Sequence, residues 1–432
     1  METPWPLTSA DVDDVMTIGG LSVADLANEH GTPLWVVDES DLRDRCKRYR
    51  TAFPDVDVAY ASKAWCVTGL LQIAAEEGLW IDVASGGELQ TAVNAGVSMD
   101  RVVFHGNNKS EDELRMAADL RVGRIAVDGF AELDRLERIG IDLGHTFAVW
   151  LRITPGIDAH THEYVRTGHD DSKFGFTLSL GFADEAMEYS LDLPHVDVVG
   201  AHAHIGSQIF GTDPFIANAE VMVGLLAHWR ARFDVTLTEL NLGGGMGIRY
   251  THEDHPVAVA RYGEAVLAAV QRACDEYKFP MPRLAVEPGR AIVAPSTVTL
   301  YRVGVVKRLP GLRTYVSVDG GMSDNIRPAL YGAEHEVRLA GRASTAALEP
   351  FTIVGKHCES GDLIRERVSL PGDLVPGDLL AVAATGAYTE SMASNYNRLP
   401  RPAAVLVKAG EVRPLIRRET YADVVARDIP LA

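Results

Sequence analysis

Apolar runs of strand length alternate with amphipathic stretches of helical period along the first two-thirds of the chain. Most runs are followed by an Ala/Leu/Glu-rich segment whose apolar residues recur at helical spacing. Strand alternating with helix predicts parallel strands. Eight such units predict a closed (β/α)₈ barrel, whose functional site lies at the carboxyl ends of the strands. The eight runs are VDVAYA, LWIDVA, VVF, RIAV, FAVWLRI, VVGAHAH, LTELNL and RLAV.

The pattern changes after Pro295. β-Branched runs separated by Gly/Pro turns replace the helical period, apart from a short piece around Tyr331, and they predict an all-β domain, a β-barrel or sandwich. The early run LWVVD precedes the first barrel helix, so we expect it to pair with this domain. We therefore predict a barrel over residues 40–295 and a β domain made of residues 1–39 and 296–432.

Composition limits the possible partners and the compartment. The chain has 432 residues, of which 41 are basic and 60 acidic, and its net charge of −19 argues against nucleic acid and anionic membranes. No apolar stretch approaches the roughly 18 residues that a membrane span needs, and no secretory signal is visible. The four cysteines are scattered without a CxxC pair, which predicts a reducing cytoplasm rather than a disulfide framework or zinc knuckle.

The ends of the first and eighth predicted strands carry Lys63 and Glu287. Lys63 is either a surface lysine or an amine in a partly apolar barrel mouth, where a lowered pKa lets it form a Schiff base. Glu287 belongs to VEPGR with Gly289 and Arg290. A glutamate that faces the barrel mouth needs a cationic partner. That partner is either Arg290 or a ligand cation such as a protonated pyridine nitrogen.

The sixth run ends in AHAHIGSQ, which contains His202, His204 and Ser207. Residues i and i+2 share one face of a strand. The two histidines are therefore a zinc pair, two buried hydrogen-bonded residues, or a pair of which one stacks on a cofactor ring. Ser207 and the neighbouring glycine suit a phosphate better than a metal, and we expect no metal.

Three consecutive glycines, Gly243, Gly244 and Gly245, follow the seventh run. Such a segment is often a simple turn, but it also lets backbone amides face an anion. Barrels often hold phosphate in the loops after strands seven and eight, so the position favours an anion site. The segment does not fit the dinucleotide fingerprint GxGxxG, and GxxxxGK[ST] does not occur in the chain.

Candidate groups for a substrate lie in the predicted β domain. The segment HCESGD is either a packed thiol and turn, or an exposed loop in which Glu359 binds an ammonium group and Cys358 moves a proton. Arg327 and Tyr331 in RPALY, and Tyr388 in GAYTESMASNYN, are donors for a carboxylate or phosphate.

Seven ordered segments together resemble the fold-type III pyridoxal-phosphate decarboxylases, which are alanine racemase-like, and more narrowly the branch that decarboxylates diaminopimelate. These segments are YASKA, HAHIGSQ, GGG, EPGR, VDGGMSDNIRPALY, CESGD and GAYTESMASNYN. Ornithine and arginine decarboxylases share the lysine, histidine, glycine and glutamate motifs but differ at the cysteine loop and at RPALY. The segment GKH departs from the Gly-Pro of many relatives, yet Cys358 and Glu359 stay in place.

The resemblance implies a pyridoxal 5′-phosphate enzyme that converts meso-2,6-diaminopimelate to L-lysine and CO₂, the last step of lysine biosynthesis. Ornithine, arginine and carboxynorspermidine are the alternative substrates. By the same resemblance Lys63 is the Schiff-base lysine, His204 stacks on the cofactor ring, and Glu287 pairs with the ring nitrogen. The implied phosphate and cofactor contacts are Ser207, Gly243, Gly244, Gly245, Gly289, Arg290 and Tyr388.

The resemblance also implies how the substrate is held and where its proton comes from. Arg290, Arg327 and Tyr331, with Tyr388 nearby, grip the distal carboxylate, and Glu359 binds the distal ammonium group. Cys358 is the implied proton donor. In this family Cys358 and Glu359 come from the partner subunit, so the implied catalytic unit is a homodimer.

Two other classes of barrel protein stay open. A metal-dependent hydrolase would use His202 and His204, although such enzymes usually carry HxH on the first strand. A non-catalytic pyridoxal-phosphate carrier would lack the β domain. The sequence leaves open the roles of five residues at strand ends or in mouth loops: Asp82, Ser85, His105, Asn107 and Lys173.

Overall fold

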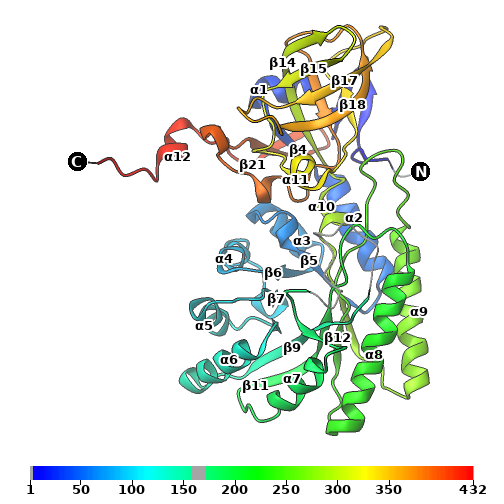
Figure 1. The fold of residues 1–432 in the computed structure, drawn as a ribbon, viewed down its shortest axis with the longest axis vertical. Coiled ribbons are helices and arrows are strands. Elements are labelled where there is room, and N and C mark those ends of the chain that lie inside the picture. The colour runs from blue at the N-terminus through cyan, green and yellow to red at the C-terminus, as the bar shows by residue number, and fades with distance from the viewer. Residues whose placement is uncertain (1–2, 158–171, 432) are drawn as a thin grey trace. The chain divides into compact units, whose positions relative to one another are not determined.

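Eight parallel strands form a closed barrel in the computed structural model, which describes residues 3–157 and 172–431 (Figure 1). Each strand pairs with the next along the chain, and the last pairs with the first. The predicted (β/α)₈ barrel is thus confirmed. Its strands are β5 (Asp57–Ala61), β6 (Trp80–Val83), β7 (Val102–Phe104), β8 (Arg124–Val127), β9 (Phe147–Thr154), β11 (Val196–Ala203), β12 (Glu239–Asn241) and β13 (Arg283–Val286), with β10 (Phe176–Thr177) beside β9.

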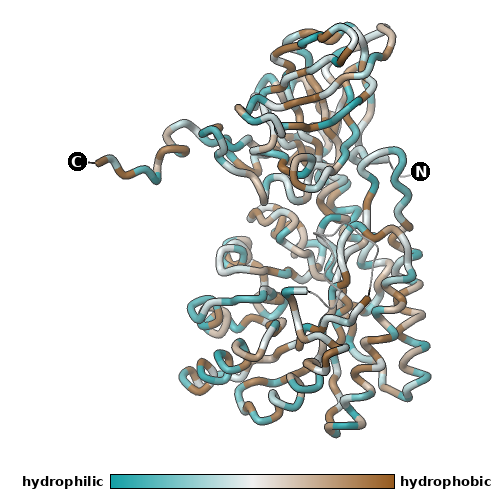
Figure 2. The backbone as a smooth tube through the Cα atoms, viewed as in Figure 1, coloured by the Kyte–Doolittle hydropathy of each residue, from teal (hydrophilic) through white to brown (hydrophobic). Residues whose placement is uncertain are grey.

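The helices between these strands lie outside the barrel and bury one face (Figure 1). In α5 the buried residues are Leu114, Ala117 and Ala118, at the spacing that a one-sided helix requires. A capping box between Ser110 and Glu113 begins that helix. Apolar and polar residues alternate along the outer helices (Figure 2). The helices are α3 (Thr68–Glu76), α4 (Gly86–Asn94), α5 (Glu111–Leu120), α6 (Phe130–Leu143), α7 (Phe182–Ser190), α8 (Asp213–Phe233) and α9 (Val259–Tyr277).

A second sheet of nine strands follows the order β18-β17-β15-β14-β4-β20-β21, with β16 and β19 off this path. The early strand β4 (Leu34–Asp38) pairs antiparallel with β14 (Thr297–Leu309) and parallel with β20 (Ala403–Lys408), which confirms the pairing expected for LWVVD. The other strands are β15 (Arg313–Val318), β16 (Val337–Leu339), β17 (Leu348–Val354), β18 (Leu363–Pro371), β19 (Leu379–Val382) and β21 (Glu411–Ile416).

A small sheet and five further α-helices complete the described elements. Strands β1 (Ala10–Val12), β2 (Val15–Ile18) and β3 (Leu21–Ser22) form a small separate sheet. The expected short helix around Tyr331 is α11. The helices are α1 (Val23–His30), α2 (Glu39–Ala52), α10 (Arg290–Val293), α11 (Arg327–Tyr331) and α12 (Tyr421–Val425).

The chain divides into two compact units. The β unit comprises Met1–Asp44, Ile248–His255 and Arg290–Ala432, and the barrel unit comprises Arg45–Gly247 and Pro256–Gly289. The domain boundaries expected from the sequence stay a prediction. Within the described ranges, no helix is long and apolar enough to cross a membrane.

Candidate active site

Lys63 lies directly after β5, in the single 3₁₀ turn Ser62–Ala64. Its neighbours Ser62 and Ala64 are buried, whereas Lys63 itself is exposed. The hydroxyl of Tyr60 donates to the carbonyl of Trp65 at 3.0 Å, and both of these side chains are fully buried. This hydrogen bond connects β5 to the residue that follows the turn and so restrains the turn. The turn therefore presents the amine of Lys63 at the carboxyl end of the first barrel strand.

Glu287 is a buried carboxylate that receives three side-chain contacts at the end of β13. Oε1 lies 2.7 Å from Nε2 of His105 and accepts a hydrogen bond from Nδ2 of Asn241 at 2.6 Å. Oε2 lies 3.2 Å from Nε2 of His202. Burial alone would raise the pKa of Glu287, but the charge of His105 and the hydrogen bonds of His105 and His202 hold that pKa well below its usual range. The barrel unit therefore holds a negative charge inside its rim.

The ring and carboxylate atoms of His105, His202 and Glu287 lie within 4.8 Å of one another, close enough to share a metal ion. The orientation of Asn241 argues for a different use. Its Oδ1 accepts the N–H of Gly243 at 2.8 Å, which turns its Nδ2 donor toward Glu287. An N–H donor aimed at the shared oxygen repels a cation and stabilises an anion. The cluster is thus built to hold a carboxylate.

The candidate metal group among the described residues contains His202 but not His204, so the alternative of a zinc pair formed by these two histidines gains no support. β11 ends at Ala203, so the alternation that would align the two rings stops before His204. Nδ1 of His204 instead accepts the N–H of Gly244 at 3.2 Å. Burial lowers the pKa of His202 to about 4, so its ring is neutral near pH 7. Burial also lowers the pKa of His204 well below its usual value, and the charge of Lys63 adds to that effect.

The three glycines after β12 allow backbone to lie against backbone. A Cβ on Gly244 would lie 2.0 Å from the carbonyl oxygen of Glu287, and one on Gly243 would lie 2.5 Å from that of Ala203. Gly245 has φ +116°, and its Cβ would lie 2.3 Å from the carbonyl oxygen of Gly206. A side chain at any of these positions would clash with the backbone of a neighbouring strand end, so the close approach requires glycine. The N–H groups of Gly243 and Gly244 already donate to Asn241 and His204, so phosphate binding by these two amides stays a prediction.

The five residues whose roles the sequence left open differ in their contacts and in their burial. Nε2 of His105 lies 4.0 Å from the buried carboxylate of Asp82, whose pKa is raised by burial. Ser85 caps α4 by accepting the N–H of Glu88 at 3.3 Å. The amine of Lys173 lies 4.9 Å from the centre of the Phe174 ring, and Asn107 is exposed. His105 thus contacts Glu287, and Asp82 interacts electrostatically with both Glu287 and Lys63.

The β unit gathers two buried arginines among three tyrosine rings. The guanidinium carbon of Arg290 lies 4.9 Å from the ring centre of Tyr388, and Nη1 donates to the hydroxyl of Tyr250 at 2.5 Å. The guanidinium carbon of Arg327 lies 5.3, 5.5 and 5.8 Å from the ring centres of Tyr250, Tyr331 and Tyr388. Among the described residues, Nε of Arg327 has no hydrogen-bond partner. The cluster is thus suited to an anion with planar oxygens, such as a carboxylate.

The two arginines of this cluster also affect each other's charge. Burial lowers the pKa of Arg327, and the neighbouring charge of Arg290 lowers it further. Burial alone would raise the pKa of Tyr250, but the charges of Arg290 and Arg327 lower it. The sequence did not single out Tyr250, although it lies only five residues after the triple glycine.

The loop that carries Cys358 and Glu359 is fixed through its backbone. The carboxylate of buried Asp362 accepts both the N–H and the ring Nδ1–H of His357 at 2.8 Å. The N–H of Cys358 donates to Oδ1 of Asn397 at 2.8 Å. The side chains of Cys358 and Glu359 are themselves exposed. The interpretation of this segment as an exposed, shaped loop therefore agrees with the structure.

An exposed lysine, a buried anionic carboxylate and a glycine-lined rim on one (β/α)₈ barrel are the features of a protein that binds an aldehyde-bearing cationic heterocycle. The family model described as the pyridoxal binding domain of pyridoxal-dependent decarboxylases matches residues 39–294. The chain belongs to this family of pyridoxal-dependent decarboxylases.

Similarity to one branch of the family extends over nearly the whole chain. Diaminopimelate decarboxylase of Bacillus subtilis is 49% identical over 419 residues, 96% of this chain and 95% of that protein. The enzyme of the same name from Halalkalibacterium halodurans is 47% identical, with 96% and 95% covered. The crystal structure of M. jannaschii diaminopimelate decarboxylase with L-lysine has a TM-score of 0.93 at 33% identity, with 98% of each chain covered. The similarity thus includes the β unit as well as the barrel.

Proposed function

We propose that this chain decarboxylates meso-2,6-diaminopimelate to L-lysine and CO₂, the last step of lysine biosynthesis, with pyridoxal 5′-phosphate as cofactor. The expected pyridoxal-dependent decarboxylase is confirmed by the family match, and the full-length relatives carry this activity in their names. The observation that carries the proposal is the ionised, buried Glu287 at the end of the barrel that displays Lys63.

The residues of the barrel unit fit the cofactor. Pyridoxal phosphate, when bound, supplies an electron sink that accepts the electron pair left at the substrate Cα when CO₂ departs. Lys63 would hold it covalently, and Glu287 would keep its ring nitrogen protonated, because a negative charge in a dried pocket stabilises a positive neighbour more than water does. His204 would cover its ring. The remaining contacts would come from Ser207, Gly243, Gly244, Gly245 and Gly289 of the barrel unit, and from Arg290 and Tyr388 of the β unit.

The β unit would supply the substrate contacts. Arg290, Arg327 and Tyr331 would bind the distal carboxylate, and the buried Nε of Arg327, which has no hydrogen-bond partner among the described residues, supports this assignment. Lysine and ornithine have no such carboxylate and would leave the guanidinium groups unpaired, which is strongly discriminating. Glu359 would bind the distal ammonium group, and the thiol of Cys358 would return a proton to Cα.

The substrate assignment is tested by parallel turnover assays. Purified protein with pyridoxal phosphate should release CO₂ from diaminopimelate far faster than from ornithine, arginine or carboxynorspermidine. Faster turnover of any of these three would replace the substrate. No turnover of any of them, together with metal in the purified protein, would return the chain to the hydrolase alternative.

We also propose a cytoplasmic homodimer in which each subunit supplies Cys358 and Glu359 to its partner. Lys63→Ala and Cys358→Ala subunits would each be inactive alone. Mixed under dissociating conditions and reassembled, they should regain about a quarter of the wild-type activity, since random pairing in a twofold dimer restores one site per mixed dimer. No recovery, in a mixture shown to contain mixed dimers, would place Cys358 in the same subunit as Lys63.

A further inference from the structure

We infer that His105 is a positioning residue that fixes the carboxylate of Glu287, and that a buried ion pair between Lys109 and Glu132 holds His105 in place for that task. The inference rests on the proposed pairing of Glu287 with the cofactor. Neither the family resemblance nor the sequence gives His105 a role.

The contact of His105 with Glu287 is short and shielded from water. His105 is buried, and its Nε2 lies 2.7 Å from Oε1, which is shorter than the 3.2 Å from Nε2 of His202 to Oε2. The two rings meet edge to face, with centres 4.7 Å apart. With Asn241 on the same oxygen as His105, the carboxylate has donors on both oxygens and one preferred orientation.

The backbone at His105 is attached to the neighbouring strand. Its N–H donates to the carbonyl of Val83 in β6 at 2.7 Å. The next residue, Gly106, has φ +121°, and a Cβ there would lie 3.2 Å from the carbonyl oxygen of Ala84. The positive φ of Gly106 therefore produces a turn directly after His105. Lys109 follows this turn and makes the next contacts with the barrel.

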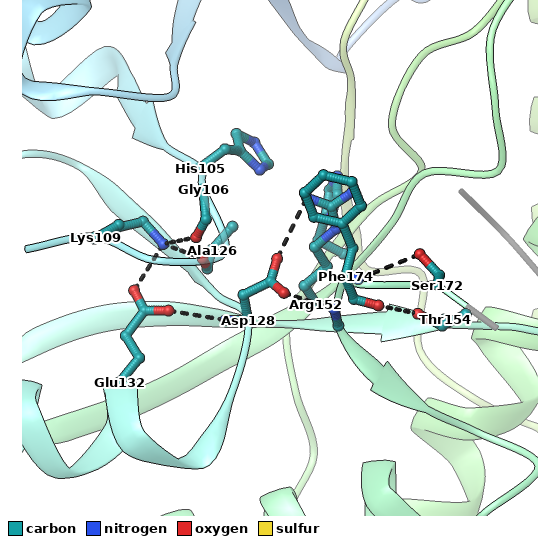
Figure 3. Close-up of polar contacts among 12 residues, drawn as sticks. His105, Gly106, Lys109, Ala126, Asp128, Glu132, Arg152, Thr154, Ser172 and Phe174 are labelled. Atoms are coloured by element: carbon teal, nitrogen blue, oxygen red, sulfur yellow. Dashed lines mark hydrogen bonds and ion pairs between the residues drawn. The ribbon is translucent and has the colours of Figure 1, made fainter. Parts of the chain in front are cut away.

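The ammonium group of Lys109 ties this loop to β8 and α6 (Figure 3). It donates to the carbonyls of Gly106 at 2.8 Å and Ala126 at 2.7 Å, and to Oε1 of Glu132 at 2.7 Å. These three acceptors use all three protons of the amine. The side chain of Lys109 is only 1% exposed and that of Glu132 3%. Removing either partner of an ion pair buried this deeply would destabilise the fold, since the other would be left as an uncompensated buried charge.

The other oxygen of Glu132 extends the same network. It accepts the N–H of Asp128 at 3.0 Å, and Asp128 in turn pairs with Arg152 at 3.4 Å (Figure 3). The loop after β7 is thus attached to the ends of β8 and β9. This network connects the ends of the neighbouring strands β7, β8 and β9. It restrains the position of His105, and His105 in turn restrains the carboxylate of Glu287.

Three variants test the inference. His105→Leu removes the ring nitrogen, whereas His105→Gln keeps an N–H donor at a similar reach. His145→Leu is the matched control, because His145 lies before β9 and its ring packs on Phe147 rather than on Glu287. Each protein is measured for kcat, KM and, without substrate, for the dissociation constant of pyridoxal phosphate by equilibrium dialysis.

We expect His105→Leu to lower kcat by about 10- to 100-fold, the range found for partners that orient a ligand-binding group, with KM nearly unchanged. Its cofactor should dissociate more readily. His105→Gln should recover most of both losses, and His145→Leu should match the wild type. Wild-type values in His105→Leu, or equal losses in the Leu and Gln variants, would overturn the inference.

A double variant keeps the test valid if His105→Leu does not fold. Lys109→Met/Glu132→Leu removes the ion pair without leaving one charge unpaired, and it should weaken cofactor binding and kcat in the same direction but less. Unchanged values in a folded double variant would remove the pair from the inference. The proposed function fails separately, if the wild-type protein neither binds pyridoxal phosphate nor releases CO₂.

Discussion

The barrel unit and the β unit bury groups of opposite charge. In the barrel unit, a buried carboxylate, Glu287, is surrounded by three side-chain contacts that keep it negative. In the β unit, two buried guanidinium groups, Arg290 and Arg327, lie close to the rings of tyrosines. Each unit maintains a charge that burial opposes, and each is completed by a ligand group of the opposite sign. A cationic heterocycle fits the first and a carboxylate fits the second.

The largest effect should come from removing the amine of the barrel unit. Lys63→Ala should lose activity by about 10⁴-fold or more, as enzymes do when a covalent group is removed. After incubation with pyridoxal phosphate and borohydride, mass spectrometry should find the label on Lys63 in the wild type and no label in the variant. A label on another lysine in the wild-type protein would contradict the assignment.

Neutralising the carboxylate of the barrel unit should have the next largest effect. Glu287→Gln should lower kcat by about 10²- to 10³-fold, the usual loss when one preorganised electrostatic contact is removed. Glu276→Gln, on the exposed face of α9, is the matched control and should leave kcat unchanged. Equal kcat values in the wild type and Glu287→Gln would remove this carboxylate from the chemistry.

The β unit contains two buried groups whose effects on stability oppose each other with pH. Burial lowers the pKa of His335 to about 3, so the unfolded chain binds more protons between that value and its ordinary pKa of 6.5, and stability rises with pH across that range. Burial raises the pKa of Asp324 from 3.8 to about 7, so stability falls as pH rises across that interval. From about pH 4 to 6.5 each contributes about 1.4 kcal/mol per pH unit with opposite sign.

Single variants should separate these two contributions. Relative to the wild type, His335→Gln should make stability fall more as pH rises from 4 to 6.5, whereas Asp324→Asn should make it rise more. Urea unfolding at several pH values measures the slopes. Identical slopes in the wild type and both variants would show that neither group keeps its shifted pKa.

Removing one cation from the β unit should have the smallest effect on catalysis. Arg327→Ala should raise KM for diaminopimelate by about 10- to 100-fold, since a hydrogen bond to a charged group contributes about 1.5–3 kcal/mol. Cofactor binding should stay unchanged. If KM does not change, Arg327 does not bind the substrate.

Much of the fold could be predicted, because buried parallel strands read as apolar runs, and here these runs alternate with stretches of helical period. The pairing of β4 was also predicted from its place before the first barrel helix. The sequence analysis did not find β16, β18, β21 or the small sheet of β1–β3. These strands are short or partly exposed, so their hydrophobic pattern is weak.

The site was less predictable than the fold. Residues in motifs, such as Glu287 and Arg327, could be named because their neighbours are distinctive. His105, Asn241 and Tyr250 could not be given roles, because their contacts depend on which strand ends meet across the barrel or on a distant loop. His204 lies one residue beyond the end of β11, so the two-residue alternation of a strand does not determine the direction of its side chain.

The central claim is that Glu287 keeps the cofactor's ring nitrogen protonated. Reconstituting the wild-type protein and Glu287→Gln with pyridoxal phosphate labelled with ¹⁵N in the ring measures this directly by NMR. The account predicts the shift of a protonated nitrogen in the wild type and of an unprotonated one in the variant. An unprotonated nitrogen in the wild type, or the same shift in both proteins, would contradict it.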